Sequence, residues 1–276
     1  MGNAAFIVWR ETIEAMLVIG ILHGWLSAQS ELEADARRHA ARWLWGGVGA
    51  GLALAGLLAL ALLGMQTWAG ATTLEWFQAL VPLVAAGLIF QMVVWMRHHG
   101  AGLRRELEAG MSAAARRAHW AGMALLAAIA VGREGAETVI FLYGASGHEG
   151  AANLFAGGAL GFVLALAAYA LLARGALWFS WRVFFRATEL LLLLLGGALL
   201  VDAMDKLIGL EALPALADPL WNAGFLLDDT GRVGGLLAAF TGWRAQPAGM
   251  SYLALALWWG LAGALVLRPR PTGRRA

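Results

Sequence analysis

The sequence carries two copies of one charged pentapeptide, each inside a long apolar stretch. The copies are Arg10-Glu11-Thr12-Ile13-Glu14 and Arg133-Glu134-Gly135-Ala136-Glu137. In a helix, two Glu side chains three residues apart lie on one face, and an Arg four residues before the second Glu is close enough to pair with it. Carboxylate oxygens favour hard cations such as magnesium, calcium, manganese or iron. The repeated pattern therefore predicts a site that handles cations.

The charges of the two motifs do not balance. If two helices pack motif to motif, the four carboxylates face only the two guanidinium groups of Arg10 and Arg133. An excess of about two negative charges in a low-dielectric environment requires protons or a cation to neutralise it. We expect all four Glu to be metal ligands, namely Glu11, Glu14, Glu134 and Glu137. The alternative is that each Arg forms a buried structural bridge with its own Glu.

The composition indicates an integral membrane protein. Of the 276 residues, 61% are hydrophobic and only 14% are charged, whereas about 25% of the residues of a soluble domain are charged. The chain contains no Cys, so disulfides, thiolate metal sites and Cys nucleophiles are excluded. With no Met or His pattern beside the motifs, copper(I) is not expected either.

Hydropathy predicts an all-α protein with seven transmembrane helices in a single transmembrane domain, 1–276. A charge at mid-membrane costs at least ~3 kcal/mol, so the ionisable residues of the first and fourth spans imply a functional site. The predicted spans are residues 4–26, 44–64, 76–96, 119–142, 153–173, 183–203 and 250–267. We expect repeat one at about 4–96, repeat two at about 119–203, an outer segment at 204–249 and a seventh helix at about 250–267.

The basic residues predict the orientation in the membrane. Fifteen of the twenty Lys and Arg fall in the regions that would lie on one side, three on the other, and two within the motifs. The positive-inside rule then places the N-terminus outside and the C-terminus inside. The first and fourth helices run in opposite directions under this topology, so both motifs lie at similar depth. This predicts an inverted repeat with the site at its interface.

Five further residues are secondary candidates for the ion path. Glu189 and Asp202 either support the path or reach the membrane interface, and Gln91 either lines the path or bonds between helices. Asp228 and Asp229 either attract cations through their field or belong to an ordinary solvated loop.

The two motifs also resemble a known family. Arg-Glu-x-x-Glu in the first and fourth of seven spans resembles the oxidase-dependent iron permease family, which includes fungal high-affinity iron permeases and bacterial EfeU-type permeases. The family hallmark is Arg-Glu-Gly-Leu-Glu. The second copy keeps the Gly as Gly135, whereas the first has Thr12 in its place. The segment 231–243 resembles the family as well.

The resemblance implies iron uptake across the cytoplasmic (inner) membrane, with iron as the transported substrate and the motif Glu residues as its ligands. It implies as partners a periplasmic iron-binding protein and a haem peroxidase or oxidase. We expect a multi-pass protein in contact with the lipid bilayer, with no enzymatic activity, no organic cofactor and no nucleic-acid partner. Two alternatives stay open: a proton-linked transporter or channel for another divalent metal such as manganese, and an intramembrane metalloenzyme.

Overall fold

The computed structural model describes residues 1–29, 33–99, 103–116, 120–146, 151–173, 181–229 and 231–267. Within these ranges the fold is all-helical, without strands. The helices are α1 (Gly2–Ala28), α2 (Ala34–Trp68), α3 (Ala71–His99), α4 (Leu103–Arg116), α5 (Trp120–Ala145), α6 (Ala151–Ala173), α7 (Trp181–Gly209), α8 (Arg232–Thr241) and α9 (Gly249–Leu267).

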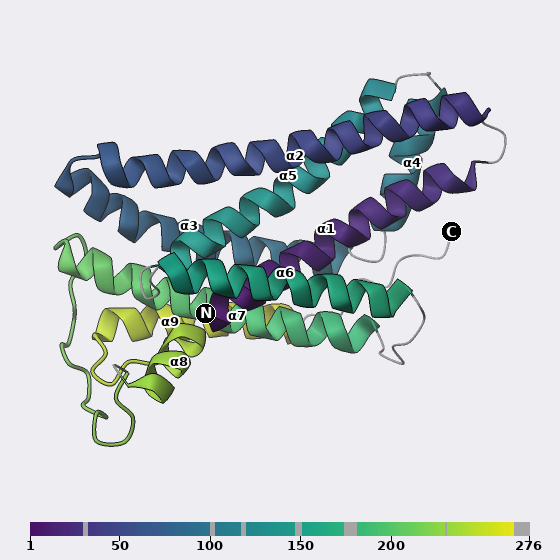
Figure 1. Cartoon of the computed structure of the whole chain (residues 1–276). Helices are drawn as coiled ribbons and strands as arrows, with labels where there is room; N and C mark the ends of the chain where they lie inside the picture. The colour runs from purple at the N-terminus through teal and green to yellow at the C-terminus, as the bar shows by residue number, and fades with distance from the viewer. Residues whose placement is uncertain are drawn as a thin grey trace.

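The helices pack in pairs that join distant parts of the chain. Helix α2 packs along α5, α6 packs along α1, and α3 packs along α7 (Figure 1). Helices α1 and α5 also contact each other. Let α1, α2 and α3 correspond to α5, α6 and α7. The contact of α2 with α5 then corresponds to that of α6 with α1, and the contacts of α3 with α7 and of α1 with α5 each correspond to themselves. The packing thus supports the predicted inverted repeat.

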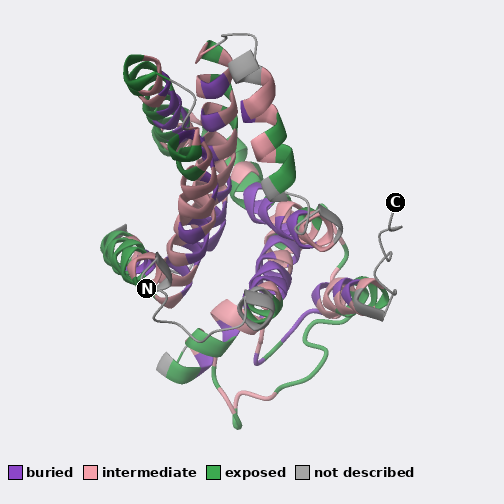
Figure 2. Ribbon diagram, turned by 90° about the vertical axis from the view of Figure 1, so that its right-hand side faces the viewer, coloured by how far each residue is buried: buried purple, intermediate pink, exposed green. Residues whose placement is uncertain are grey.

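Two hydrophobic clusters show that α1 and α5 run in opposite directions. The first cluster contains Ile7 from the start of α1 and Phe141 from the end of α5. The second contains Leu22 from the end of α1 and Met123 from the start of α5. Both charged motifs fall between the two clusters. Figure 2 shows buried residues on the helix faces that turn toward one another and exposed residues on the outer faces.

Four helices are long and apolar enough to cross a membrane, judged by length and composition alone. They correspond to Ala34–Trp68, Ala71–Arg97, Ala152–Leu171 and Arg186–Gly209. Helices α1 and α5 are long enough to span ~30 Å of hydrocarbon, but each carries one Arg and two Glu within its motif. The apolar part of α9, Gly249–Leu265, is shorter. The structure thus supports a multi-pass membrane protein, while seven spans and their orientation stay a prediction.

Several helices extend beyond the spans expected from hydropathy, and one helix lies between two of them. The region between the third and fourth expected spans contains α4, which packs on α5 and α1. Hydropathy misses α4 because it is amphipathic, with Met111 fully buried and charged residues on the other face. Helix α2 begins ten residues before the expected span, because its first turns are polar but helix-forming. Helix α7 continues to Gly209, so residues 204–209 of the expected outer segment are helical.

The rest of the outer segment is attached to the helices by polar contacts. Gly242 ends α8 in the left-handed conformation, with φ of 73°, which a glycine adopts without strain. The next turn bonds to α7, where the Arg244 Nε donates to Asp205 at 2.9 Å. Ser251 at the start of α9 donates its hydroxyl to the other oxygen of Asp205 at 2.5 Å. These contacts link the outer segment, α7 and α9.

Candidate metal centre

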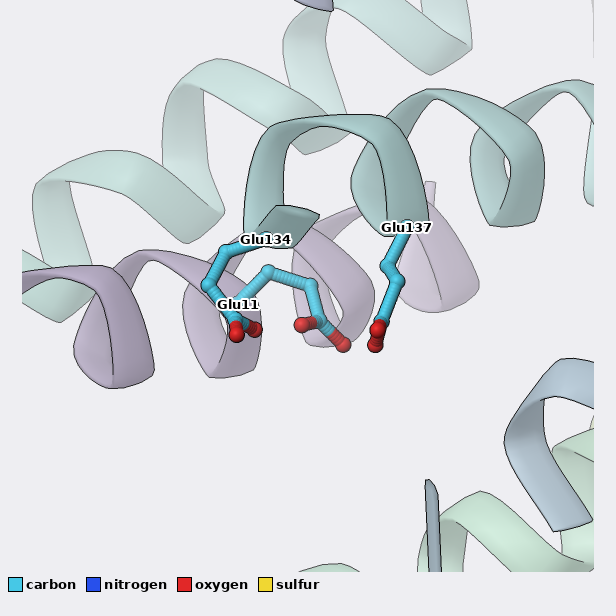
Figure 3. Close-up of side chains that lie close together, drawn as sticks. All are labelled: Glu11, Glu134 and Glu137. Carbon is cyan, nitrogen blue, oxygen red and sulfur yellow. The ribbon is translucent and has the colours of Figure 1, made fainter. Parts of the chain in front are cut away.

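Three of the four motif carboxylates meet where α1 and α5 pack together. Glu11, Glu134 and Glu137 each place one carboxylate oxygen so that all three oxygens lie within 4.8 Å of one another. Figure 3 shows the three side chains extending to the same side of the two helices. Elsewhere in the described ranges, no second group of three His, Asp or Glu side chains lies this close together. The sequence separates the two motifs by 123 residues, and the antiparallel packing of α1 and α5 brings them together.

Two of the three residues are buried and Glu134 is partly buried, and all three carboxylates are incompletely bonded. Glu11 is 1% exposed and Glu137 is 9% exposed. Each of the three has a buried Oε2 without a hydrogen-bond partner among the described residues. A buried charged oxygen without a partner is costly, so this arrangement fits a bound cation or protons. Three carboxylates supply part of the oxygen shell of a hard cation and leave the remaining positions to water.

Arg10 lies on one side of this site and is almost fully enclosed. Its guanidinium contacts Glu11 at 2.6 Å and Glu14 at 2.5 Å, with the side chain 3% exposed. The guanidinium also donates to two thioethers of α3, those of Met92 at 3.3 Å and Met96 at 3.5 Å. The pairing between Arg10 and Glu14 is the structural bridge considered as an alternative from the sequence, and it leaves Glu14 outside the group of three.

Arg133 occupies the corresponding place on α5 but has a different environment. Its Nε donates to Glu137 at 2.8 Å, and its guanidinium lies over the ring of Trp95, 4.7 Å from the centroid. The Arg133 side chain is 39% exposed. A cation over an indole face is an attractive contact, so α3 contributes to the site on both sides, through Trp95 here and through two Met residues at Arg10.

Glycines allow the helices that carry the motifs to approach their neighbours closely. A Cβ built on Gly135, inside the second motif, would lie 2.6 Å from the Cβ of Ala55 on α2. Such a distance requires something to shift, so no larger residue fits without movement. Gly135 is therefore explained by packing against α2 and not by contact with a metal. At the equivalent position, 123 residues earlier, α1 has Thr12.

The secondary candidates lie apart from the three carboxylates. Glu189 accepts a bond from the Nε of Arg97, which joins α7 to α3. Asp202 is 4% exposed and pairs with Lys206 at 2.8 Å. Gln91 and Asp228 are exposed, and Asp229 is half-buried. None of these residues belongs to the group of three carboxylates, and their role in the ion path stays a prediction.

The residues of α3 that touch the site were not found by sequence reasoning. Met92 and Met96 are four residues apart, so they share a helix face, and Trp95 is on the same turn. Apolar side chains at this spacing are ordinary for a packed membrane helix, and nothing in the sequence indicates that two thioethers face a guanidinium. Along the sequence no Met pattern stands beside the motifs, and the structure places two Met residues of α3 against Arg10.

Comparison with known proteins identifies the relatives of this chain. The sequence profile of the iron permease FTR1 family matches residues 1–267. Two relatives named ferrous iron permease EfeU are similar to this chain. The one from Escherichia coli O6:H1 is 29% identical over 211 residues, covering 72% of this chain and 70% of the relative. The one from Yersinia pestis is 28% identical over 207 residues, covering 72% and 69%.

An uncharacterized protein of Archaeoglobus fulgidus is 29% identical over 283 residues, which covers 99% of this chain and 96% of the relative. No solved structure matches. The family consists of transporters and not of enzymes, which excludes the metalloenzyme alternative. The profile match over nearly the whole chain shows that this protein belongs to the iron permease FTR1 family.

Proposed function

We propose that this protein takes up iron across the cytoplasmic membrane, and that Glu11, Glu134 and Glu137 bind the ion on its way. The observation that carries the proposal is the cluster of three carboxylates at the contact of α1 and α5. Each has one buried oxygen that finds no hydrogen-bond partner in the part of the chain that the structure describes. Its occurrence in a chain of an iron permease family supports iron as the ion. The names of the EfeU relatives favour ferrous iron as the carried form.

The two arginines reduce the net negative charge of the site. Arg10 contacts Glu11 at 2.6 Å and Arg133 contacts Glu137 at 2.8 Å, so two of the three ligands share their charge with a guanidinium. A permeating ion must bind strongly enough to enter and weakly enough to leave. Three free carboxylates would hold a divalent cation too tightly for release, and the guanidinium groups weaken the site.

The direction of transport follows from the predicted topology. With the N-terminus outside, the motifs lie in the outer half of the membrane, nearer the start of α1 and the end of α5. Iron would enter from the outer side, exchange water for carboxylate oxygens, and leave toward the Arg-rich cytoplasmic side. This proposal includes the seven spans and the location in the cytoplasmic membrane.

Uptake of radioactive ferrous iron into proteoliposomes tests the proposal. Glu11→Gln and Glu134→Gln are expected to lower uptake by more than about tenfold. Mutation of a residue that only hydrogen-bonds to a metal ligand already lowers metal affinity or activity by about 10–100-fold. Glu75→Gln is the matched control, since Glu75 is an exposed carboxylate of α3 outside the cluster. Uptake by Glu11→Gln at the level of Glu75→Gln would refute the assignment.

The same assay separates iron from manganese. An oxygen-only site also suits manganese, so transport of another divalent metal is the competing proposal. An excess of manganese is expected to leave most of the iron uptake in place. Equal inhibition of iron uptake by manganese and by unlabelled iron would favour the competing proposal.

The partner proteins implied by the family resemblance also belong to this proposal. A periplasmic iron-binding protein and a haem peroxidase or oxidase would meet the outer segment, which exposes Phe225 and Leu226. Co-purification of such proteins with the full chain from native membranes, compared with Phe225→Ser, tests whether this surface binds them.

A further inference from the structure

Two close helix contacts in the protein repeat one another at a fixed interval. A Cβ built on Gly47 of α2 would lie 2.1 Å from the carbonyl oxygen of Ala124 on α5, and one built on Gly157 of α6 would lie 2.5 Å from that of Met1, next to α1. Met1 and Ala124 are 123 residues apart. The two Arg-Glu motifs are separated by the same interval.

The relation holds again one turn further along. A Cβ on Gly51 would lie 2.9 Å from the oxygen of Ala128, and one on Gly161 would lie 2.2 Å from that of Ala5. Ala5 and Ala128 are also 123 residues apart. The pair of α1 with α6 is therefore equivalent to the pair of α5 with α2, and each tightly packed pair carries one motif.

The motifs themselves break this equivalence. Arg10 contacts both carboxylates of its motif, Glu11 at 2.6 Å and Glu14 at 2.5 Å. Arg133 forms an ion pair with Glu137 alone among the described carboxylates, at 2.8 Å. As a result Glu14 is outside the cluster, while its counterpart Glu137 is inside it. Two equivalent helix pairs therefore hold their motifs in two different arrangements. Because both motifs consist of one Arg and two Glu at the same spacing, either motif could adopt either arrangement.

Building on the proposed function, we infer that Arg10 and Arg133 are positioning residues that alternate between two conformations of the permease. In the conformation described here, Arg10 holds Glu14 away from the metal cluster. In the second conformation, Arg133 binds both carboxylates of its own motif and withdraws Glu137, and Glu14 joins Glu11 in its place. The cation keeps Glu11 and Glu134 as constant ligands and exchanges the third.

The contacts of both arginines with α3 allow this exchange. Arg10 donates to the sulfur atoms of Met92 and Met96, which are weak acceptors, so its movement breaks no strong hydrogen bond to α3. Arg133 is held on the α3 side by the face of Trp95 and is 39% exposed, so it has room to turn toward its motif.

The tight glycine contacts identify the bodies that move. At these glycines a built Cβ would overlap the backbone of the neighbouring helix, so the two helices of each pair are in close contact. We therefore take α1 with α6, and α5 with α2, as units that move together. The contact between α1 and α5 is the one that changes, and it is where the carboxylates meet. When the third ligand of the cation changes, the angle between the two helix pairs changes with it.

Iron binding and iron uptake, measured on the same variants, test the inference. Glu14→Gln should bind ferrous iron in detergent within about twofold of the wild type, because Glu14 is not a ligand in the present conformation, yet lose uptake. Glu137→Gln should also lose uptake and should bind iron more weakly than Glu14→Gln, but by less than about tenfold, because the second conformation replaces Glu137 with Glu14. The double variant should bind more than about tenfold more weakly. Loss of binding in Glu137→Gln alone, or normal uptake by Glu14→Gln, would overturn the inference.

A distance measurement checks the same exchange without iron. The chain has no Cys, so spin labels can be placed at single introduced sites. Leu63→Cys on α2 and Phe155→Cys on α6 are exposed positions on the two units, 53% and 78% accessible. Combined with Glu14→Gln and with Glu137→Gln, this label pair should give two different distance distributions. Identical distributions in the two variants would contradict the exchange.

The two experiments separate this inference from the proposed function. If the wild type neither binds nor takes up iron, the proposed function fails, whereas the spin-label distances still report whether two conformations exist. If the wild type transports iron and both variants share one distance distribution, the function stands and the exchange is wrong.

Discussion

Glu11 on α1 and Glu134 on α5 place carboxylate oxygens within 4.8 Å of one another, although 123 residues separate them in the chain. Each has one oxygen buried without a hydrogen-bond partner among the described residues. The two residues occupy the same place in their motifs. Their approach follows from the antiparallel packing of two helices that each carry an Arg and two Glu.

Iron should stabilise the folded protein through this cluster. A ligand that binds only the native state at a concentration about 100 times its dissociation constant adds ~2.7 kcal/mol to the free energy of unfolding. Ferrous iron is therefore expected to raise the thermal midpoint of the wild type in detergent and to have little effect on Glu11→Gln. Thermal unfolding with iron, and again after adding a ferrous chelator, measures this. An equal rise in both proteins would show that the ion binds elsewhere.

Removal of the buried arginine should cost more stability than removal of the exposed one. Arg10→Gln leaves Glu11 and Glu14 without their guanidinium, and breaking a buried ion pair typically costs ~3–5 kcal/mol. Arg133→Gln removes a side chain that is 39% exposed and has one carboxylate partner, so its loss should cost less. The thermal midpoints of the two variants, measured without iron, test this prediction: the midpoint of Arg10→Gln should be the lower one. A lower midpoint for Arg133→Gln would contradict the prediction.

The contact between α2 and α5 should not tolerate a methyl group at Gly47. A Cβ there would lie 2.1 Å from the carbonyl oxygen of Ala124, and overpacking of this kind typically costs ~1–3 kcal/mol. Gly49→Ala is the matched control on the same helix, since nothing lies within 4 Å of its built Cβ. Thermal unfolding should show a lower midpoint for Gly47→Ala and an unchanged or higher one for Gly49→Ala, because Ala favours the helix.

The Gly of the second motif should be replaceable only together with its neighbour on α2. A Cβ on Gly135 would lie 2.6 Å from the Cβ of Ala55, so Gly135→Ala is expected to lower both stability and iron uptake, with a stability cost of ~1–3 kcal/mol. Adding Ala55→Gly removes the opposing methyl group and should restore most of both. A double variant no better than Gly135→Ala would mean that Gly135 acts by some means other than packing.

The sequence alone indicated the membrane class and the two motifs that supply the candidate site. Charged side chains inside apolar stretches are costly, so the two Arg-Glu motifs were recognisable without a structure. Their identical spacing also indicated an internal repeat, and the resemblance to the iron permease family followed from the same residues. Hydropathy could not locate α4, because an amphipathic helix has no continuous apolar run.

Only the tertiary structure decided which carboxylates come together. The two motifs have the same charges and spacing, so nothing in the sequence distinguishes Glu14 from Glu137. The structure separates them because Arg10 reaches both carboxylates of its motif, against the thioethers of α3, whereas Arg133 reaches one. Contacts of this kind depend on which helix faces the motif, and that is set by packing between residues distant in the chain.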